Sequence, residues 1–246
     1  MSAPLVVLIT AGSAGLGAAT ARVFAKAGMR VVINYSTNGS RADTLVEQLH
    51  EVSPLSKTKE CPNFVSIRAD LSKKSDIERL VTESVSQMGK LDAVFSNGGW
   101  TSIQDFNDLD DNVDEEMWDK CWNMNVKSHL WLMHAAKKYL DDSEGVFITT
   151  ASLAGAYSVT KAAQIHLAKS LAMICSPRIR VNSVSPGILL TDWGQKFPQE
   201  RLDSAMAKTQ LKRFATVEDV AEQVLCFVRS RSVTGANAVI DAGWSL

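Results

Sequence analysis

Residues 5–24, LVVLITAGSAGLGAATARVF, decide the fold of this chain. A continuous apolar run is typical of a strand buried on both faces, and here it leads into a turn that carries Gly12, Gly15 and Gly17. The residues after the turn have the apolar period of a helix. A strand, a glycine-rich turn and a helix in this order predict a turn whose backbone can approach a phosphate group, with free N–H groups at the helix start. The alternative is a glycine-rich turn that only packs the helix against the sheet.

The same alternation of strand and helix patterns continues along the chain. Strands are predicted at residues 5–10, 30–34, 64–69, 93–96, 146–150, 180–185 and 238–240, and helices at 15–27, 41–50, 75–88 (capped at Ser75 or nearby), 117–139, 157–174 and 217–229. This order predicts a doubly wound α/β fold of Rossmann type, with a parallel sheet between two helical layers. We expect a single domain of three layers over residues 1–246, with an irregular substrate-loop insertion at about 188–214.

Composition narrows the class of protein. The chain has 246 residues, 46% hydrophobic and 22% charged, with a net charge of −1. No basic block suggests nucleic acid or a membrane surface as a partner, and no apolar stretch reaches the ~18–20 residues of a membrane helix. The N-terminus reads as a strand and not as a signal peptide. The cysteines and histidines show no metal-ligand spacing, so we expect no metal site; they are Cys61, Cys121, Cys175, Cys226, His50, His129, His134 and His166. We expect the scattered cysteines to be reduced thiols, as in a cytoplasmic protein.

The end of the second predicted strand bears on the choice of cofactor. An acidic residue there would bind the ribose hydroxyls of NAD, but the sequence reads Asn34-Tyr35-Ser36-Thr37. A carboxylate would also repel a 2′-phosphate, so its absence, with Arg41 close behind, favours NADP over NAD. Arg41 could equally be an ordinary surface residue at a helix start.

Tyr157 and Lys161 stand four positions apart in AYSVTKAA and would share one face of a helix. An ammonium beside a phenol lowers the phenol pKa from its usual value near ~10, which would let the tyrosine act as a general acid or base. Alone this spacing is weak evidence, because a buried ring beside a solvated lysine gives the same pattern.

Further motifs in a fixed order give the chain a clear resemblance to the short-chain dehydrogenase/reductase family, in its single-domain form. The match runs from Leu5 to Gly243. The stretches that carry it are Thr10–Gly17 (TAGSAGLG), Asp70-Leu71, Ser96-Asn97-Gly98-Gly99, Asn125 in MNVKS, Ser152 in ASLAG, Tyr157 with Lys161, and Pro186-Gly187 with Thr191. Each motif is weak alone, whereas the ordered set is specific.

The resemblance implies the roles of individual residues. The catalytic residues would be Asn125, Ser152, Tyr157 and Lys161. Ser152 would bind the substrate oxygen, and Tyr157 would pass a proton to or from that oxygen while hydride moves to or from the nicotinamide C4. Lys161 would hold the nicotinamide ribose, and Asn125 would position a water in a proton relay. The cofactor-binding set would be Thr10, Gly12, Ser13, Gly15, Leu16, Gly17, Asn34, Tyr35, Ser36, Arg41, Asp70, Leu71, Asn97, Gly98, Gly99, Tyr157, Lys161, Pro186, Gly187, Ile188 and Thr191.

These roles imply an NADP(H)-dependent oxidoreductase that interconverts a ketone and a secondary alcohol, acting as a reductase in cells. One alternative is a non-catalytic dinucleotide-binding protein, and another is a lyase or isomerase on the same fold.

Two departures from the family pattern affect this interpretation. Ala11 stands where the first glycine of the turn is usual, and alanine fits if its φ is negative, with Gly12 supplying flexibility.

Ser152 and Tyr157 are only five positions apart, which leaves too little chain for the usual loop. Either the loop is truly short or the sequence omits a flexible stretch between Gly155 and Tyr157. We expect an omission because the motifs on both sides are intact.

Apolar residues near the predicted site suggest the substrate and the assembly. Five of them could form a lid over a bulky apolar substrate or could instead fill the core under a loop: Trp193, Phe197, Leu202, Met206 and Trp100. Trp244 could belong to the same lid or lie at a subunit contact. The predicted helices at 117–139 and 157–174 are apolar around much of their circumference. Because similar proteins associate through these helices, we expect a homodimer or homotetramer.

Overall fold

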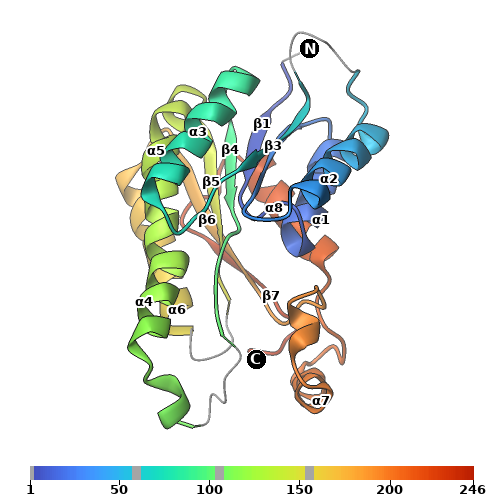
Figure 1. Ribbon diagram of the computed structural model, residues 1–246, viewed down its shortest axis with the longest axis vertical. Coiled ribbons are helices and arrows are strands. Elements are labelled where there is room, and N and C mark those ends of the chain that lie inside the picture. Colours follow the sequence, from blue (N-terminus) through green and yellow to red (C-terminus); the bar gives the residue numbers. More distant parts are fainter. Residues whose placement is uncertain (1–2, 57–61, 103–107, 153–157) are drawn as a thin grey trace.

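A computed structural model describes residues 3–56, 62–102, 108–152 and 158–246. Within these ranges one parallel sheet has the strand order β3-β2-β1-β4-β5-β6-β7 (Figure 1). The strands are β1 Val6–Ile9, β2 Arg30–Tyr35, β3 Phe64–Arg68, β4 Ala93–Ser96, β5 Val146–Thr150, β6 Arg180–Pro186 and β7 Asn237–Ile240. The predicted fold class, a doubly wound parallel sheet, is therefore confirmed.

Helices cover both faces of this sheet, which makes the three layers visible in Figure 1. They are α1 Gly15–Lys26, α2 Gly39–Val52, α3 Lys74–Met88, α4 Glu115–Trp122, α5 Ser128–Asp142, α6 Ser158–Ile174, α7 Gln199–Lys208 and α8 Val217–Arg229. Helices α1, α2 and α8 pack on one face, while α3, α5 and α6 pack on the other. None of the helices in the described ranges combines the length and the hydropathy needed to cross a bilayer.

Strand β1 shows why its sequence is apolar without alternation. Val6 and Leu8 join the core beneath α3 and α5, whereas Val7 and Ile9 join the core beneath α1 and α8. All four side chains have no exposed surface. Successive strand residues point to opposite faces, so a strand with helices on both sides must be apolar at every position.

Several predicted boundaries differ from those in the structure. Helix α2 begins at Gly39, before the predicted residue 41, because the Asn38 side chain accepts a hydrogen bond from the Arg41 backbone N–H at 2.9 Å and caps the helix. The cap of α3, predicted at Ser75 or nearby, is Lys73, which makes no side-chain hydrogen bond to the helix start. The predicted helix over 117–139 is divided into α4 and α5 by a π-helical turn, Asn123–Lys127.

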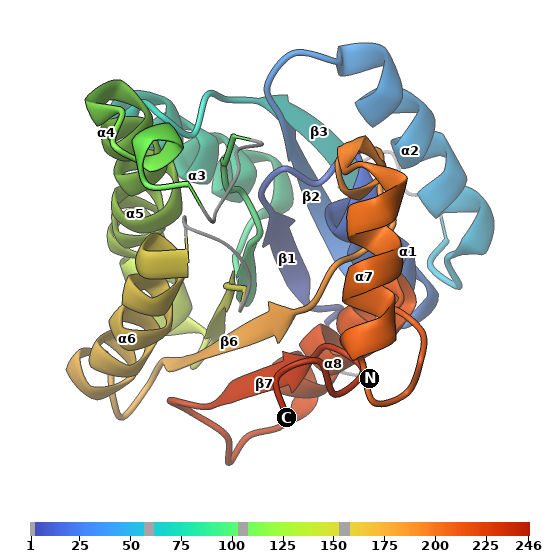
Figure 2. The same ribbon diagram turned by 90° about the horizontal axis from the view of Figure 1, so that it is seen from below.

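The chain reverses its direction of winding between β1 and β4, which are neighbours in the sheet. In α/β sheets of this kind, ligands bind at that point, beyond the carboxyl ends of the strands. Figure 2 shows the molecule from below, with α7 on one side of the sheet and α4 on the other. The predicted insertion at 188–214 supplies α7 and a 3₁₀ turn, Gly194–Lys196.

Candidate active site

A cleft of about 1100 Å³ opens at the carboxyl edge of the sheet. It is lined by residues from the glycine-rich turn, the ends of β4, β5 and β6, the start of α2, helix α6 and the insertion that carries α7. The predicted site residues among them are Gly15, Leu16, Arg41, Asn97, Gly99, Ser152, Lys161, Pro186, Gly187, Ile188 and Thr191. Segments far apart in the sequence are thus brought to one cleft. Tyr157 lies outside the described residues.

The turn after β1 holds its shape through contacts to the end of β2. The Gly12 N–H donates to the Asn34 carbonyl at 2.8 Å, and the Ala11 N–H donates to Asn34 Oδ1 at 3.1 Å. Ala11 has a φ of +48°, so the condition under which alanine fits this turn without strain is not met. At Gly12 an added Cβ would lie 2.9 Å from the Ile9 carbonyl oxygen, so close packing requires the glycine there.

The start of α1 fits the pyrophosphate of a dinucleotide. Ala14 is the N-cap and provides no side-chain hydrogen bond, and the first turn of the helix contains no acidic residue. The N–H groups of that turn and the positive end of the helix dipole are therefore free to bind an anion. A side chain at Gly17 would overlap the Ala11 carbonyl, so the backbone of the turn lies close against the helix.

Some predicted cofactor residues shape the cleft without lining it. Thr10 is buried, and its Oγ1 accepts hydrogen bonds from the N–H groups of Asn97 at 2.9 Å and Gly98 at 3.1 Å. The Leu71 side chain occupies the space that a Cβ on Gly98 would need. Thr10 and Leu71 therefore position the turn after β4.

The other predicted cofactor residues outside the cleft lining lie near the ends of β1, β2 and β3. Asn34 is buried and donates from Nδ2 to the Ala69 carbonyl at 3.1 Å. Ser13 and Tyr35 are half-buried, and Ser36 is exposed. These residues lie beside the glycine-rich turn without bordering the cleft itself.

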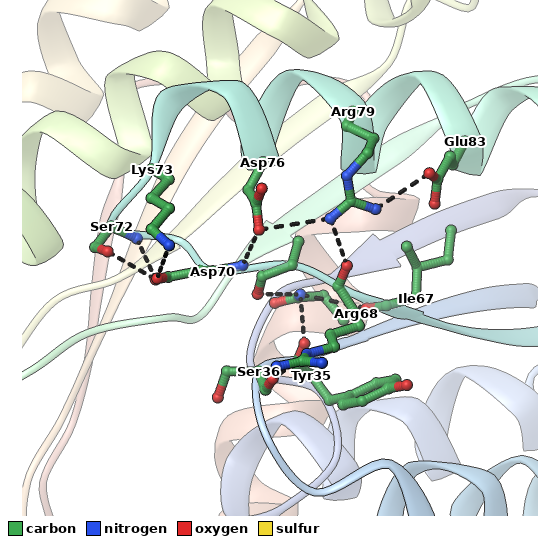
Figure 3. A network of polar contacts seen from close by, with 12 residues as sticks. Tyr35, Ser36, Ile67, Arg68, Asp70, Ser72, Lys73, Asp76, Arg79 and Glu83 are labelled. Carbon is green, nitrogen blue, oxygen red and sulfur yellow. Dashed lines mark hydrogen bonds and ion pairs between the residues drawn. The ribbon is translucent and has the colours of Figure 1, made fainter.

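Asp70 uses its carboxylate to organise the loop that begins α3 (Figure 3). Its Oδ1 accepts from the Ser72 hydroxyl at 2.7 Å and from the Ser72 N–H at 3.0 Å, and Lys73 Nζ lies 3.6 Å from Oδ2. The Ser72 hydroxyl hydrogen bond is the largest cause that holds the pKa of Asp70 below its usual value. Asp76 in turn accepts from the Asp70 N–H at 2.8 Å.

Lys161 is buried where α6 meets the end of β5. Its Nζ donates to the Thr150 carbonyl at 2.8 Å and to Gln164 Oε1 at 2.9 Å. Burial lowers the pKa of Lys161 to about 7, with Cys121 acting weakly in the opposite direction. Ser152 is half-buried and lines the same cleft. The structure therefore provides, at one opening, a serine hydroxyl and a lysine that gains or loses its charge near neutral pH.

Asn125 is buried in the π-helical turn, and both ends of its side-chain amide contact protein groups. Its Oδ1 accepts from the Trp100 N–H at 2.8 Å, while Nδ2 donates to the Trp100 carbonyl at 2.8 Å and to Thr160 Oγ1 at 3.0 Å. The side chain thus ties the loop after β4 to α6. A role in positioning a water stays a prediction.

Two buried polar residues that the motif analysis did not assign lie behind Lys161. Gln164 contacts Lys161 and also His129, whose Nε2 is 3.0 Å from Gln164 Nε2. His129 Nδ1 lies 2.6 Å from Ser96 Oγ. The only signals in the sequence are spacings: Gln164 follows Lys161 by three positions and His129 follows Asn125 by four, which places each pair on one helix face.

Aromatic side chains contribute to the lining of the cleft. Trp100, Trp193, Phe197 and Trp244 line it, and the Trp193 and Phe197 rings meet edge to face at 4.9 Å. The guanidinium of Arg201 lies 5.0 Å from the Phe197 ring. Two other predicted lid residues do not line the cleft: Leu202 is buried and Met206 is half-buried.

Arg41 connects the start of α2 with the insertion after β6. Its Nη1 lies 3.2 Å from Asp192 Oδ2, and both side chains are largely exposed and border the cleft. Such an exposed pair is worth little to stability. The pair does place the Asp192 carboxylate next to Arg41, the residue predicted to bind the 2′-phosphate of NADP.

Comparison with known proteins agrees with this arrangement. A family profile described as enoyl-(acyl carrier protein) reductase matches residues 10–245. The chain is 30% identical over 249 residues to "Granaticin polyketide synthase putative ketoacyl reductase 2" of Streptomyces violaceoruber, covering 97% of this chain and 95% of that protein. It is 28% identical over 248 residues to a 3-oxoacyl-[acyl-carrier-protein] reductase of Staphylococcus epidermidis, covering 96% and 97%.

A solved structure extends the likeness to three dimensions. A short chain dehydrogenase from Burkholderia cenocepacia in complex with NADP superposes with a TM-score of 0.87 at 28% identity, covering 98% of this chain and 97% of that chain. The likeness therefore spans the whole sheet and both helical layers.

Proposed function

Because the chain belongs to the short-chain dehydrogenase/reductase family, we propose that it is an NADP(H)-dependent enzyme that interconverts a ketone and a secondary alcohol, and that it acts as a reductase. Its membership makes it an NAD(P)-dependent oxidoreductase. The single observation that carries the finer proposal is the position of Lys161. A buried lysine with a lowered pKa opens on the cleft that the glycine-rich turn also borders.

The residues around the cleft would divide the work of the reaction. When bound, the nicotinamide supplies or accepts a hydride at its C4. Ser152 holds the substrate oxygen by a hydrogen bond. Tyr157 gives or takes a proton at that oxygen, and the Lys161 ammonium keeps the pKa of the phenol low enough for this. Asn125 holds the loop after β4 in place through Trp100.

Support for NADP comes from the end of β2 and the start of α2. The residues after the strand, Ser36 and Thr37, bring no carboxylate there, while Arg41 borders the cleft with its guanidinium. A relative at 28% identity is an NADP complex, which also supports this choice. Arg41 is paired with Asp192 and would have to exchange that partner for a phosphate.

The substrate proposed is bulky and at least partly apolar. Trp100, Trp193, Phe197 and Trp244 would surround its apolar portion, and Arg201 sits over the Phe197 ring near the opening. Named relatives reduce ketoacyl and 3-oxoacyl groups, which supports a carbonyl compound of this kind. A small sugar would leave the aromatic wall without a partner.

A screen of ketones with NADPH and with NADH tests the proposal. We expect oxidation of NADPH with at least one bulky ketone, and a Tyr157→Phe variant that still binds NADPH but loses most turnover. Tyr139→Phe is the matched control, because Tyr139 packs against the core under α5, away from the cleft. Full turnover by Tyr157→Phe would show that another group transfers the proton.

The short interval between Ser152 and Tyr157 favours a second candidate, a dinucleotide-binding protein without catalysis. It predicts NADPH binding in a fluorescence titration with no oxidation by any ketone. The intact mass separates the two explanations of the interval: agreement with 26.8 kDa shows that the loop is truly short.

We also propose a homodimer or homotetramer in the cytoplasm. Exposed apolar residues on the outer surfaces of α5 and α6 support association: Leu130, Val159, Met173 and Ile174 are each more than two-fifths exposed. A monomeric mass by light scattering at micromolar concentration would exclude this assembly.

A further inference from the structure

Behind Lys161, a chain of buried polar side chains runs from α6 through α5 to β4. Lys161 Nζ, Gln164, His129 and Ser96 follow one another at 2.9, 3.0 and 2.6 Å. All four residues are buried, with at most 6% of their surface exposed. Buried polar groups need hydrogen-bond partners, so each link restricts the next.

When Lys161 is charged, chemistry fixes the direction of every hydrogen bond in this chain. The Lys161 ammonium has only donors, so Gln164 must turn its Oε1 toward it. The Gln164 amide N–H then points at His129 Nε2, which must be the unprotonated nitrogen of a neutral ring. The His129 proton therefore resides on Nδ1 and is donated to Ser96 Oγ.

Reversing one link would reverse the others. A proton on His129 Nε2 would face the N–H group of Gln164. Gln164 would then have to turn its amide over, which would place its NH₂ group against the Lys161 ammonium. The Nδ1-protonated tautomer of His129 and a Gln164 carbonyl turned toward the Lys161 ammonium therefore accompany each other.

No carboxylate faces Lys161 within the described ranges. The titratable groups that act on it are Cys121 from α4 and His129 from α5, while β5 contributes only the Thr150 carbonyl. Burial raises the pKa of the Cys121 thiol, so this group is not an anion at neutral pH. Two neutral oxygens, those of Thr150 and Gln164, hold the buried ammonium.

We propose that Gln164 and His129 are positioning residues for Lys161: His129 orients the Gln164 amide, and the Gln164 carbonyl then holds the Lys161 ammonium at the cleft. The importance of these two residues for the reaction rests on the proposed function, in which Lys161 takes part. Their geometry is independent of that function. Because the pKa of His129 is about 3, its ring is uncharged at neutral pH and acts on Lys161 through Gln164.

The test is a direct titration of Lys161 in the protein without cofactor. In protein labelled with ¹³C at lysine Cε, the Lys161 signal is identified by its loss in Lys161→Arg, and its shift is followed against pH. Gln164→Met removes one hydrogen bond to the ammonium and should lower the Lys161 pKa by about one unit or more. Gln164→Glu places a carboxylate there and should raise it. Opposite shifts from two variants of similar size distinguish positioning from loss of packing.

His129→Phe adds a second criterion. It should lower the Lys161 pKa as well, because the Gln164 amide loses its orientation. In the double variant with Gln164→Met, the two effects should not add, since they act through one link. Thr149→Val is the control: the Thr149 hydroxyl is buried on β5 with no partner among the described residues, and its loss should leave the Lys161 titration unchanged.

The outcomes separate this inference from the proposed function. An unchanged Lys161 titration in folded Gln164→Met and Gln164→Glu, or additive effects with His129→Phe, would overturn the positioning role. Should Gln164→Met not fold, the upward shift in Gln164→Glu decides alone. A fluorescence titration in which NADPH and NADH both fail to bind the wild type would sink the proposed function but leave the titration of Lys161 interpretable.

Discussion

Lys161 donates from Nζ to the carbonyl oxygen of Thr150 at 2.8 Å, and this bond joins the last residue of β5 to the first turns of α6. Thr150 also donates from its hydroxyl to Asn97 Oδ1 at 3.1 Å. The residues that would contact a nicotinamide ribose are therefore linked to the turn after β4. This link spans the interval between Ser152 and Tyr157, whose shortness is the main departure from the family pattern.

Binding of a dinucleotide should take up a proton near neutral pH. Burial lowers the pKa of Lys161 to about 7 in the free protein. Ribose oxygens and a nearby pyrophosphate favour the ammonium, so the pKa rises on binding and the complex holds more protons than its parts. Calorimetry of NADPH binding at pH about 7.5, in buffers of different ionisation enthalpy, should show this uptake, and it should fade near pH 6 where Lys161 is already charged. Lys161→Met should abolish it; heats that do not depend on the buffer would contradict the prediction.

The protein should lose stability in acid through His129. Burial, assisted by the charge of Lys161, lowers the pKa of His129 from 6.5 to about 3, while a hydrogen bond to the backbone of Gly98 opposes this. Between these values the unfolded chain binds a proton that the native protein does not, so this contribution to stability falls as the pH falls from 6.5 toward 3. Urea unfolding of His129→Gln across that range should give a shallower dependence on pH. His134→Gln, at an exposed position of the same helix, should keep the wild-type slope.

The fold could be predicted from the sequence because its signals are local and repeated. Strand β4 and helix α8 have the predicted bounds, 93–96 and 217–229. In α8 the reason is visible: Thr216 and Asp219 form a capping box at the start of a strongly amphipathic helix. Such features depend on residues a few positions apart, which the sequence displays directly.

The parts that could not be predicted depend on contacts between distant segments. The π-helical turn allows Asn125 to reach the Trp100 backbone, and no residue pattern near position 125 predicts such a turn. The link between Gln164 and His129 joins α6 to α5, 35 positions apart. A sequence shows residue types at helical spacing but not which helix faces which. The motif residues themselves were predictable only because a whole ordered set resembles one family.

Ala11→Gly should stabilise the protein. Ala11 adopts a φ of +48°, a region that costs a residue with a Cβ about 1–2 kcal/mol. Glycine removes this strain but loses more freedom on folding, by about 0.5–1 kcal/mol, so a net gain of roughly 0.5–1 kcal/mol is expected. Ala14→Gly is the control, because Ala14 has a φ of −150° and gains nothing from glycine. Equal changes in the free energy of unfolding for both variants would show that the backbone of Ala11 is not strained.

Asp192→Asn should strengthen the binding of NADPH more than that of NADH. Asp192 holds Arg41 at 3.2 Å and would face a bound 2′-phosphate as a like charge. Removing one such charge between partly exposed groups is worth ~1 kcal/mol, or about a fivefold lower Kd for NADPH, with little change for NADH. The free energy of unfolding should change by less than ~1 kcal/mol, as for exposed ion pairs in general.

The matched control for Asp192→Asn is Asp203→Asn on α7, an exposed carboxylate that accepts a hydrogen bond from Gln199 at 2.8 Å and does not border the cleft. It removes the same charge from the same insertion, so it corrects for the change in net charge. If Asp192→Asn tightened NADPH and NADH equally, the carboxylate would act on the insertion as a whole. Arg41 would then not be the group that recognises the 2′-phosphate, and the preference for NADP would need another residue.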